Sequence, residues 1–176
     1  MPVPVTSDRD ADFAGFVDAR WSRLVRFAHL LTGDFHDAED LVQTTLVKVC
    51  ARWRHIPAAE ADTYVRGALV NNHRSRVRKR RVAQLLTPFV PHRAVRGHAD
   101  AVETRIAVGE ALDMLSVRQR ATVVLRFWED MTEQQTALVL GCSTSTVKVH
   151  TRRALAVLRA HPALAVYASV GGERDE

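Results

Sequence analysis

The 176-residue chain is 47% hydrophobic, so it can bury one core of moderate size or two small ones. Its formal net charge of +5 favours a polyanionic partner, with nucleic acid ahead of an anionic membrane. No stretch approaches the roughly 18 uninterrupted apolar residues of a spanning helix, and the acidic start, Met1 to Asp12, lacks the features of a signal peptide. We therefore expect a cytoplasmic protein that has no membrane partner.

Two helices are predicted before Pro57. Apolar residues recur every three or four positions between Phe13 and Leu31, as on one face of a helix, and Thr32-Gly33-Asp34 ends that helix. A second helix is predicted to start near Asp37, whose carboxylate favours a helix N-terminus, and to be closed by Pro57. The inward stripe of this second helix is formed by Ala38, Leu41, Val42, Thr45, Leu46, Val49 and Trp53.

A third helix is predicted from Thr63, and its pattern dissolves into the charge run from Arg74 to Arg81. From Leu86 to about Thr104 the apolar periodicity fades and prolines appear, which predicts an extended, flexible connector between two domains. No alternating strand pattern and no internal repeat is present, so the predicted fold is all-α. Helices are expected after the connector at 106–115, 117–128, about 132–140 and about 145–160. The predicted division is a first domain 1–85, a linker 86–104, a second domain 105–160 and a tail 161–176.

The segment from Thr132 to Arg159 has the pattern of a helix-turn-helix. Thr132 can cap a helix with Gln135 three residues on, and Gly141 supplies the permissive backbone of a tight turn. Val147 is expected to pack inward and fix the last helix, although Thr136 and His150 stand where an apolar residue is common. The outward positions carry donors suited to phosphates and base edges. A turn between two ordinary helices with a solvated basic face is the alternative. The candidate DNA-contacting residues are Thr144, Ser145, Thr146, Lys148, His150, Arg152 and Arg153.

Cysteine and histidine spacing indicates neither a metal site nor an active site. Cys50 and Cys142 lie far apart, each within an apolar helical pattern, so both are interpreted as buried small hydrophobes. The eight histidines form no HExxH pair, and there is no glycine-rich phosphate loop. We therefore predict no enzymatic activity, no cofactor and no metal.

Two polar surfaces are candidates for binding. Asp40, Gln43, Thr44 and Lys48 lie opposite the apolar stripe of the second helix and form a surface that could dock on another protein. Six of the eight residues from Arg74 to Arg81 are basic, which fits electrostatic tracking of a DNA backbone. Solvation alone is the alternative for both surfaces.

The motifs, in their order along the chain, resemble those of the extracytoplasmic-function sigma factors of bacterial RNA polymerase. The segment from Asp37 to Thr45, DAEDLVQTT, resembles the polymerase-binding helix of that family, and Tyr64-Val65-Arg66 with Leu69-Val70-Asn71 resembles its promoter-melting helix. SVRQRATVVLRFW, from Ser116 to Trp128, resembles its upstream-promoter domain, as do Gly141-Cys142-Ser143 and Thr146-Val147-Lys148.

The resemblance implies that Asp40, Gln43, Thr44 and Lys48 bind the clamp of the polymerase's largest subunit. The loop from Arg54 to Asp62 lies where family members capture a base flipped out of the minus-10 element. A structural role is the alternative for His55, Tyr64, Asn71 and Asn72, in particular a core role for Tyr64. Residues implied to read or melt that element are His55, Tyr64, Asn71, Asn72, Arg74, Arg76, Arg78 and Lys79. The last helix is implied to read the minus-35 element. The implied partners are core RNA polymerase and promoter DNA, with an anti-sigma factor as a further candidate.

Some residues depart from the family's pattern. Thr44 stands where a carboxylate is common, and Arg76 and Val77 stand where close relatives often have tryptophans, so melting is expected to depend more on charge. A stand-alone regulator is the alternative function, because Thr146-Val147-Lys148-Val149-His150 also resembles the recognition helix of LuxR-type regulators. Such a protein commonly carries a receiver domain that contains strands. No strand pattern is present in the first hundred or so residues.

Overall fold

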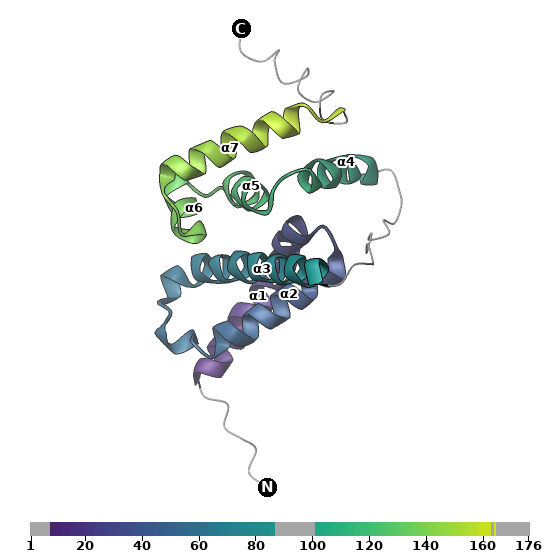
Figure 1. Ribbon diagram of the computed structural model, residues 1–176. Coiled ribbons are helices and arrows are strands. Elements are labelled where there is room, and N and C mark those ends of the chain that lie inside the picture. The colour runs from purple at the N-terminus through teal and green to yellow at the C-terminus, as the bar shows by residue number, and fades with distance from the viewer. Residues whose placement is uncertain (1–7, 87–100, 163, 165–176) are drawn as a thin grey trace. The chain divides into compact units, whose positions relative to one another are not determined.

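The computed structural model describes residues 8–86, 101–162 and 164, and across these residues it contains helices and turns but no strand (Figure 1). The all-α prediction is therefore confirmed for the described part of the chain. Contacts between residues divide the chain into two compact units, with the boundary between His73 and Arg74. That boundary falls inside a helix, α3, and each unit is described below by itself.

The first unit opens with two helices joined by a short glycine turn. Helix α1 spans Asp8–Thr32, and Gly33, with a φ of 80°, takes the left-handed conformation that lets the chain turn. Helix α2 spans Phe35–Cys50, and its N-cap is Asp34, whose Oδ1 accepts a hydrogen bond from the backbone N–H of Asp37 at 2.8 Å. The helix thus starts two residues before the predicted Asp37, which lies in its first turn.

The predicted stripe of α2 is buried, apart from the last residue assigned to it. Its buried members are Ala38, Leu41, Val42, Thr45, Leu46 and Val49. Trp53 lies beyond the end of α2 in a short 3-10 turn, η1 (Trp53–His55), and its side chain is half-buried. A second 3-10 turn, η2 (Ala58–Glu60), leads into the next helix.

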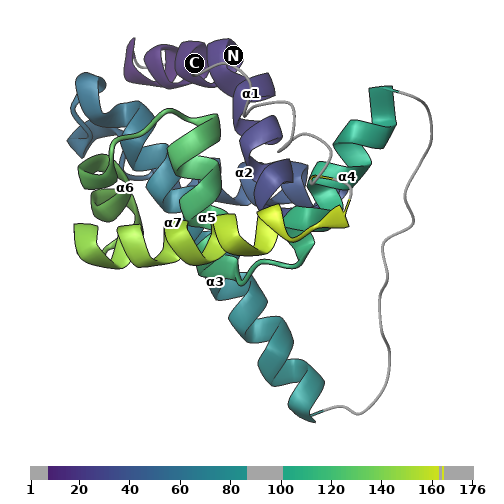
Figure 2. The ribbon, with the colours of Figure 1, turned by 90° about the horizontal axis from the view of Figure 1, so that it is seen from above.

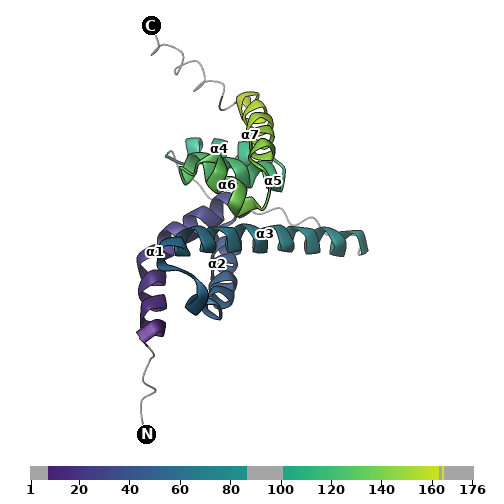
Figure 3. The same cartoon turned by 90° about the vertical axis from the view of Figure 1, so that its left-hand side faces the viewer.

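Helix α3 spans Ala61–Leu86 and is unbroken (Figure 3). Its early turns bury Val65, Leu69 and Val70. The prediction that helical structure dissolves at Arg74 was wrong, because the helix continues through the whole charge run. Arginine and lysine are good helix formers, and neither glycine nor proline occurs between Gly67 and the end of the helix.

The second unit contains α4 (Ala101–Asp113), α5 (Val117–Val123), a π-helical turn η3 (Val124–Trp128), α6 (Glu133–Leu140) and α7 (Thr144–Arg159). Capping boxes start two of these helices: Ser116 with Gln119 for α5, and the predicted Thr132 with Gln135 for α6. Helix α7 lies across α5 and contacts α6, with Val147 and Ala154 buried on its inner face (Figure 2).

Some expectations from the sequence fall outside the described residues, and others differ from the structure. The segment 87–100 of the expected connector lies outside the described residues, while 101–104 already belong to α4. Most of the expected tail also lies outside them. The expectation that both cysteines are buried was wrong: Cys50 is exposed at the last turn of α2, beside the buried Val49, and Cys142 is half-buried in the turn before α7. No helix in the described part of the chain is both long and apolar enough to cross a membrane.

Candidate functional site

The turn between α6 and α7 has helix-turn-helix geometry. Gly141 adopts the left-handed conformation, φ 62° and ψ 46°, and the next backbone N–H, of Cys142, donates to the carbonyl of Ala137 at 3.0 Å. Ser143 then caps α7 by accepting from the backbone N–H of Thr146 at 3.2 Å. Glycine and a hydroxyl cap therefore fix where α7 starts and which face it turns outward.

The outer face of α7 presents most of the predicted DNA-contacting residues. Val147 is fully buried and holds the helix against its unit. Lys148 lies outside, with its Nζ 3.6 Å from the Glu133 carboxylate of α6. Thr146 and His150 are half-buried at the edge of this face. The exposed members are Thr144, Ser145, Lys148, Arg152 and Arg153.

His150 combines a lowered pKa with an unsatisfied nitrogen. Partial burial lowers the pKa of its imidazole below 6.5, and the positive charges of Arg118 and Arg153 lower it further. Its Nδ1 is covered and has no hydrogen-bond partner within the described structure. The imidazole is therefore mostly neutral near pH 7.

The polar surface predicted on α2 is continuous with α3. Asp40, Gln43 and Lys48 are exposed and Thr44 is half-buried. Lys48 Nζ donates to Asn72 Oδ1 at 2.8 Å. Sequence reasoning assigned Lys48 and Asn72 to different partners, and the structure brings the two side chains together.

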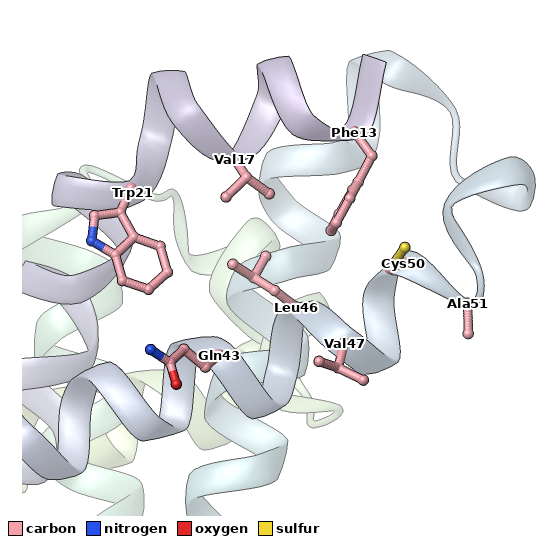
Figure 4. A pocket seen from close by; sticks show the side chains of 8 residues that line it. All are labelled: Phe13, Val17, Trp21, Gln43, Leu46, Val47, Cys50 and Ala51. Carbon is pink, nitrogen blue, oxygen red and sulfur yellow. The ribbon is translucent and has the colours of Figure 1, made fainter. Parts of the chain in front are cut away.

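An open apolar groove of about 590 Å³ lies beside this polar surface, between α1 and α2 (Figure 4). Phe13, Val17 and Trp21 point from α1 toward α2, and Leu46 points back from α2. Val47, which is 72% exposed, lies on its rim. The residues that line the groove are Phe13, Val17, Trp21, Gln43, Leu46, Val47, Cys50 and Ala51. Sequence reasoning missed this groove, although the four-residue spacing of Phe13, Val17 and Trp21 signals one face of a helix.

The residues predicted to act at the minus-10 element lie along α3 and in the segment before it. His55 is exposed in η1, and Tyr64 is 37% exposed at the start of α3, so a core role for Tyr64 is not what the structure shows. Asn71 is exposed, whereas Asn72 is half-buried. In the charge run, Arg78 and Lys79 are exposed and Arg74 and Arg76 are half-buried.

Within the described residues, no three histidine, cysteine, aspartate or glutamate side chains gather closely enough to hold a metal ion. The polar groups that the structure brings together are hydroxyls, amides, cations and single carboxylates. These groups bind phosphates, base edges and protein surfaces.

Two family models match the chain in succession. Sigma-70 region 2 matches residues 16–82, and Sigma-70, region 4 matches residues 105–158. Among curated proteins, the chain is 37% identical over 149 residues to an RNA polymerase sigma-E factor of Streptomyces avermitilis, covering 84% of this chain and 83% of the relative. It is 29% identical over 146 residues to the ECF RNA polymerase sigma factor SigL of Mycobacterium tuberculosis, covering 77% and 80%.

Solved structures agree with these relatives. The sigma factor RpoE in complex with the anti-sigma factor NepR from Bartonella quintana matches with a TM-score of 0.70 and 27% identity, covering 84% of this chain and 94% of that one. CnrH in complex with the cytosolic domain of CnrY shares the fold, with a TM-score of 0.60 at 24% identity over 84% of this chain and 85% of that one.

The chain belongs to the sigma-70 family of RNA polymerase sigma factors, in its extracytoplasmic-function group. It is a transcription initiation factor that binds core RNA polymerase and directs it to promoters. None of the relatives above is a LuxR-type regulator, and that alternative has no support.

Proposed function

We propose that each part of the chain predicted from the sequence has its own role in transcription initiation. Residues 1–85 bind the polymerase and open the minus-10 DNA, 105–160 read the minus-35 element, and 86–104 connect the two, with 161–176 as a tail. In this scheme the polymerase sets the spacing between the two promoter elements. The chain performs no chemistry itself and needs no cofactor.

The observation that carries the DNA-reading part of the proposal is the orientation of α7. Val147 and Ala154 face the core of the second unit, so Lys148, Arg152 and Arg153 necessarily point away from it. A helix that follows such a turn and carries outward cations and hydroxyls fits the major groove. Thr144, Ser145, Thr146 and His150 complete the proposed minus-35 surface.

The polymerase contact is proposed to include both the polar face and the groove. Asp40, Gln43, Thr44 and Lys48 offer charges and hydrogen bonds, and Gln43 also lines the apolar groove. An amphipathic helix from another protein can lay apolar side chains in such a groove while polar residues pair at its edge. We therefore place the helical clamp of the polymerase over α2 and the α1 side of the groove.

The minus-10 element is proposed to meet α3 and the segment before it. Tyr64 and Asn71 are exposed and can stack on or hydrogen-bond to an extruded base, and His55 lies in the preceding turn. Arg74, Arg76, Arg78 and Lys79 follow on the same helix and supply positive charge to the DNA backbone. Asn72 contributes by holding Lys48 and Thr45 in place.

An anti-sigma factor is a proposed further partner, because the two solved neighbours described above include a sigma factor bound to the anti-sigma factor NepR. Since the proposed partners are polymerase and chromosomal DNA, we propose that the protein acts in the cytoplasm.

The proposal is tested by run-off transcription with core polymerase on a library of genomic promoters. The wild-type protein is compared with Lys148→Ala plus Arg152→Ala, and with Arg26→Ala plus Arg159→Ala, which removes the same charge from exposed positions outside the proposed contacts. We expect the first pair of changes to abolish the specific transcripts and the second to preserve them. Wild-type protein that is folded and binds DNA but yields no specific transcript would contradict the proposal.

A further inference from the structure

The segment between α2 and α3 is attached to α1 at its beginning. The ring of Trp53 packs against Phe13 and Phe16, with centroid distances of 5.1 and 4.8 Å. Its indole Nε1–H donates to Asp12 Oδ2 at 3.0 Å. Edge-on and tilted ring contacts together with a hydrogen bond to a carboxylate fix both the position and the rotation of the indole.

The same segment is attached to α1 again at its end. Arg20 Nε donates to Asp62 Oδ1 at 2.9 Å, in the first turn of α3. The Arg20 guanidinium lies 4.5 Å from the centroid of the Phe16 ring, so Phe16 contacts both attachments. Both ends of the segment are therefore held by contacts with one stretch of α1, residues 12–20.

Between the two attachments the chain lies mostly at the surface, where backbone hydrogen bonds hold its two 3-10 turns. Neither η1 nor η2 contains a buried residue, and within 54–60 only Ile56 is as much as half-buried. A binding group must be held to within about 0.5 Å to discriminate its ligand, and an exposed loop depends on its supports for that precision. The supports here are Trp53 and Asp62.

We propose that Asp12 and Trp53 are positioning residues for base selection at the minus-10 element. They touch no DNA in this scheme; they set where residues 54–60 and Tyr64 stand when an extruded base enters. The inference rests on the proposed function, because it requires that this segment reads a promoter base. It assigns part of promoter specificity to α1, a helix that carries none of the predicted DNA contacts.

The test uses substitutions that alter the attachment to different degrees. Trp53→Phe keeps a ring but loses the N–H donor, and Asp12→Ala removes the acceptor from an exposed position where folding is not at risk. Asp12→Asn keeps an acceptor oxygen and serves as the conservative variant. Asp18→Ala removes another exposed carboxylate from α1 and is the control.

Each full-length variant is assayed with core polymerase on promoters that carry every base at each minus-10 position. We expect Trp53→Phe and Asp12→Ala to reduce the preference for the best base at one position about five-fold, as loss of one hydrogen bond would. Asp12→Asn and Asp18→Ala should keep that preference. Affinity for core polymerase and preference at the minus-35 element should stay within about two-fold of wild type.

The inference is overturned if base preference is unchanged in both Trp53→Phe and Asp12→Ala, or if activity falls equally on all promoters together with thermal stability. Either result, obtained with a wild-type factor that transcribes specifically, leaves the proposed function intact. A wild-type factor that yields no specific transcript removes the proposed function and this inference with it.

Discussion

The side-chain amide of Asn72 donates a hydrogen bond to the hydroxyl of Thr45 at 2.8 Å, joining α3 to α2. Thr45 is fully buried, and its hydroxyl donates a hydrogen bond to the Leu41 carbonyl at 2.7 Å, while the side-chain carbonyl of Asn72 accepts from Lys48. This three-residue connection gives Asn72 a role that its exposed neighbour Asn71 does not share.

The two asparagines should therefore respond differently to truncation. Asn72→Ala is expected to lower the free energy of unfolding by about 1–2 kcal/mol, because it removes a partner from a buried hydroxyl and from Lys48. Asn71→Ala should change it by less than about 0.5 kcal/mol, as is usual at the surface, but reduce promoter opening. Urea unfolding and permanganate footprinting measure the two effects, and equal destabilisation by both substitutions would contradict the assignment.

The groove between α1 and α2 predicts a substitution that affects binding without affecting folding. Val47→Glu places a charge on an apolar rim that a partner helix would cover, so affinity for core polymerase should fall at least about ten-fold. Because Val47 is 72% exposed, the melting temperature should hardly change. Leu138→Glu, at a residue 79% exposed in the second unit, is the matched control. Full polymerase affinity in Val47→Glu would place the clamp elsewhere.

Glu133 is expected to weaken DNA binding by α7. Its carboxylate lies 3.6 Å from Lys148 Nζ and competes with phosphate for that cation. Glu133→Gln should raise affinity for minus-35 DNA about two- to five-fold, in line with an exposed ion pair, and the gain should shrink at high salt. Asp18→Asn makes the same change of charge on α1 and should have no such effect. Fluorescence anisotropy with a short duplex measures the DNA affinity of both variants. An equal gain in affinity would show that net charge, and not the Glu133–Lys148 pair, causes the effect.

The lowered pKa of His150 predicts a loss of stability in mild acid. The unfolded chain binds a proton with a pKa near 6.5, whereas partial burial and the nearby Arg118 and Arg153 hold the folded pKa below that value. Stability is therefore greatest above the unfolded pKa and falls as pH drops through 6.5 toward the folded pKa. His150→Gln should remove part of the difference in unfolding free energy measured between about pH 7.5 and pH 5.5. An identical pH dependence in wild type and variant would show that other groups cause it.

Two buried threonines offer a matched comparison of hydroxyl satisfaction. Thr136 is fully buried in α6 and its Oγ1 has no hydrogen-bond partner in the described structure, whereas the buried Thr122 donates to the Arg118 carbonyl at 2.7 Å. Thr136→Val should raise the free energy of unfolding by about 1 kcal/mol, because it removes an unsatisfied group, while Thr122→Val should lower it or leave it unchanged. Calorimetry of both variants checks the sign, and stabilisation by Thr122→Val alone would contradict the expectation.

Local patterns carried most of what the sequence predicted correctly. These patterns lie within a single helix or at its ends, so they could be identified without knowing the tertiary structure. They are the capping box of Thr132 and Gln135, the turn glycine Gly141 and the buried stripe of α2. The family resemblance added the partners, which no local pattern specifies. The continuation of α3 was missed because the apolar pattern dissolves in the charge run, where the high helix propensity of arginine and lysine nevertheless sustains the helix.

What could not be predicted depends on which helices pack together. The groove needs α1 beside α2, and the link from Lys48 through Asn72 to Thr45 needs α2 beside α3. The same holds for Trp53, which was assigned to the stripe of α2 and instead reaches Phe13 and Phe16 across the unit. Residues far apart in sequence create these features, and periodicity within a single helix carries no record of them.

Because α3 is unbroken, it fixes the angle at which each of its side chains projects from the helix axis relative to the others. A helix of 26 residues is about 39 Å long and turns about 100° per residue, so Tyr64, Asn71 and the charge run from Arg74 hold constant angles about one axis. Inserting one residue between Asn71 and Arg74 would rotate every cation of the charge run by about 100° relative to Asn71, whereas four inserted residues would leave a rotation of only about 40°. Changes of length in this stretch are therefore compatible with promoter opening mainly in whole turns of helix.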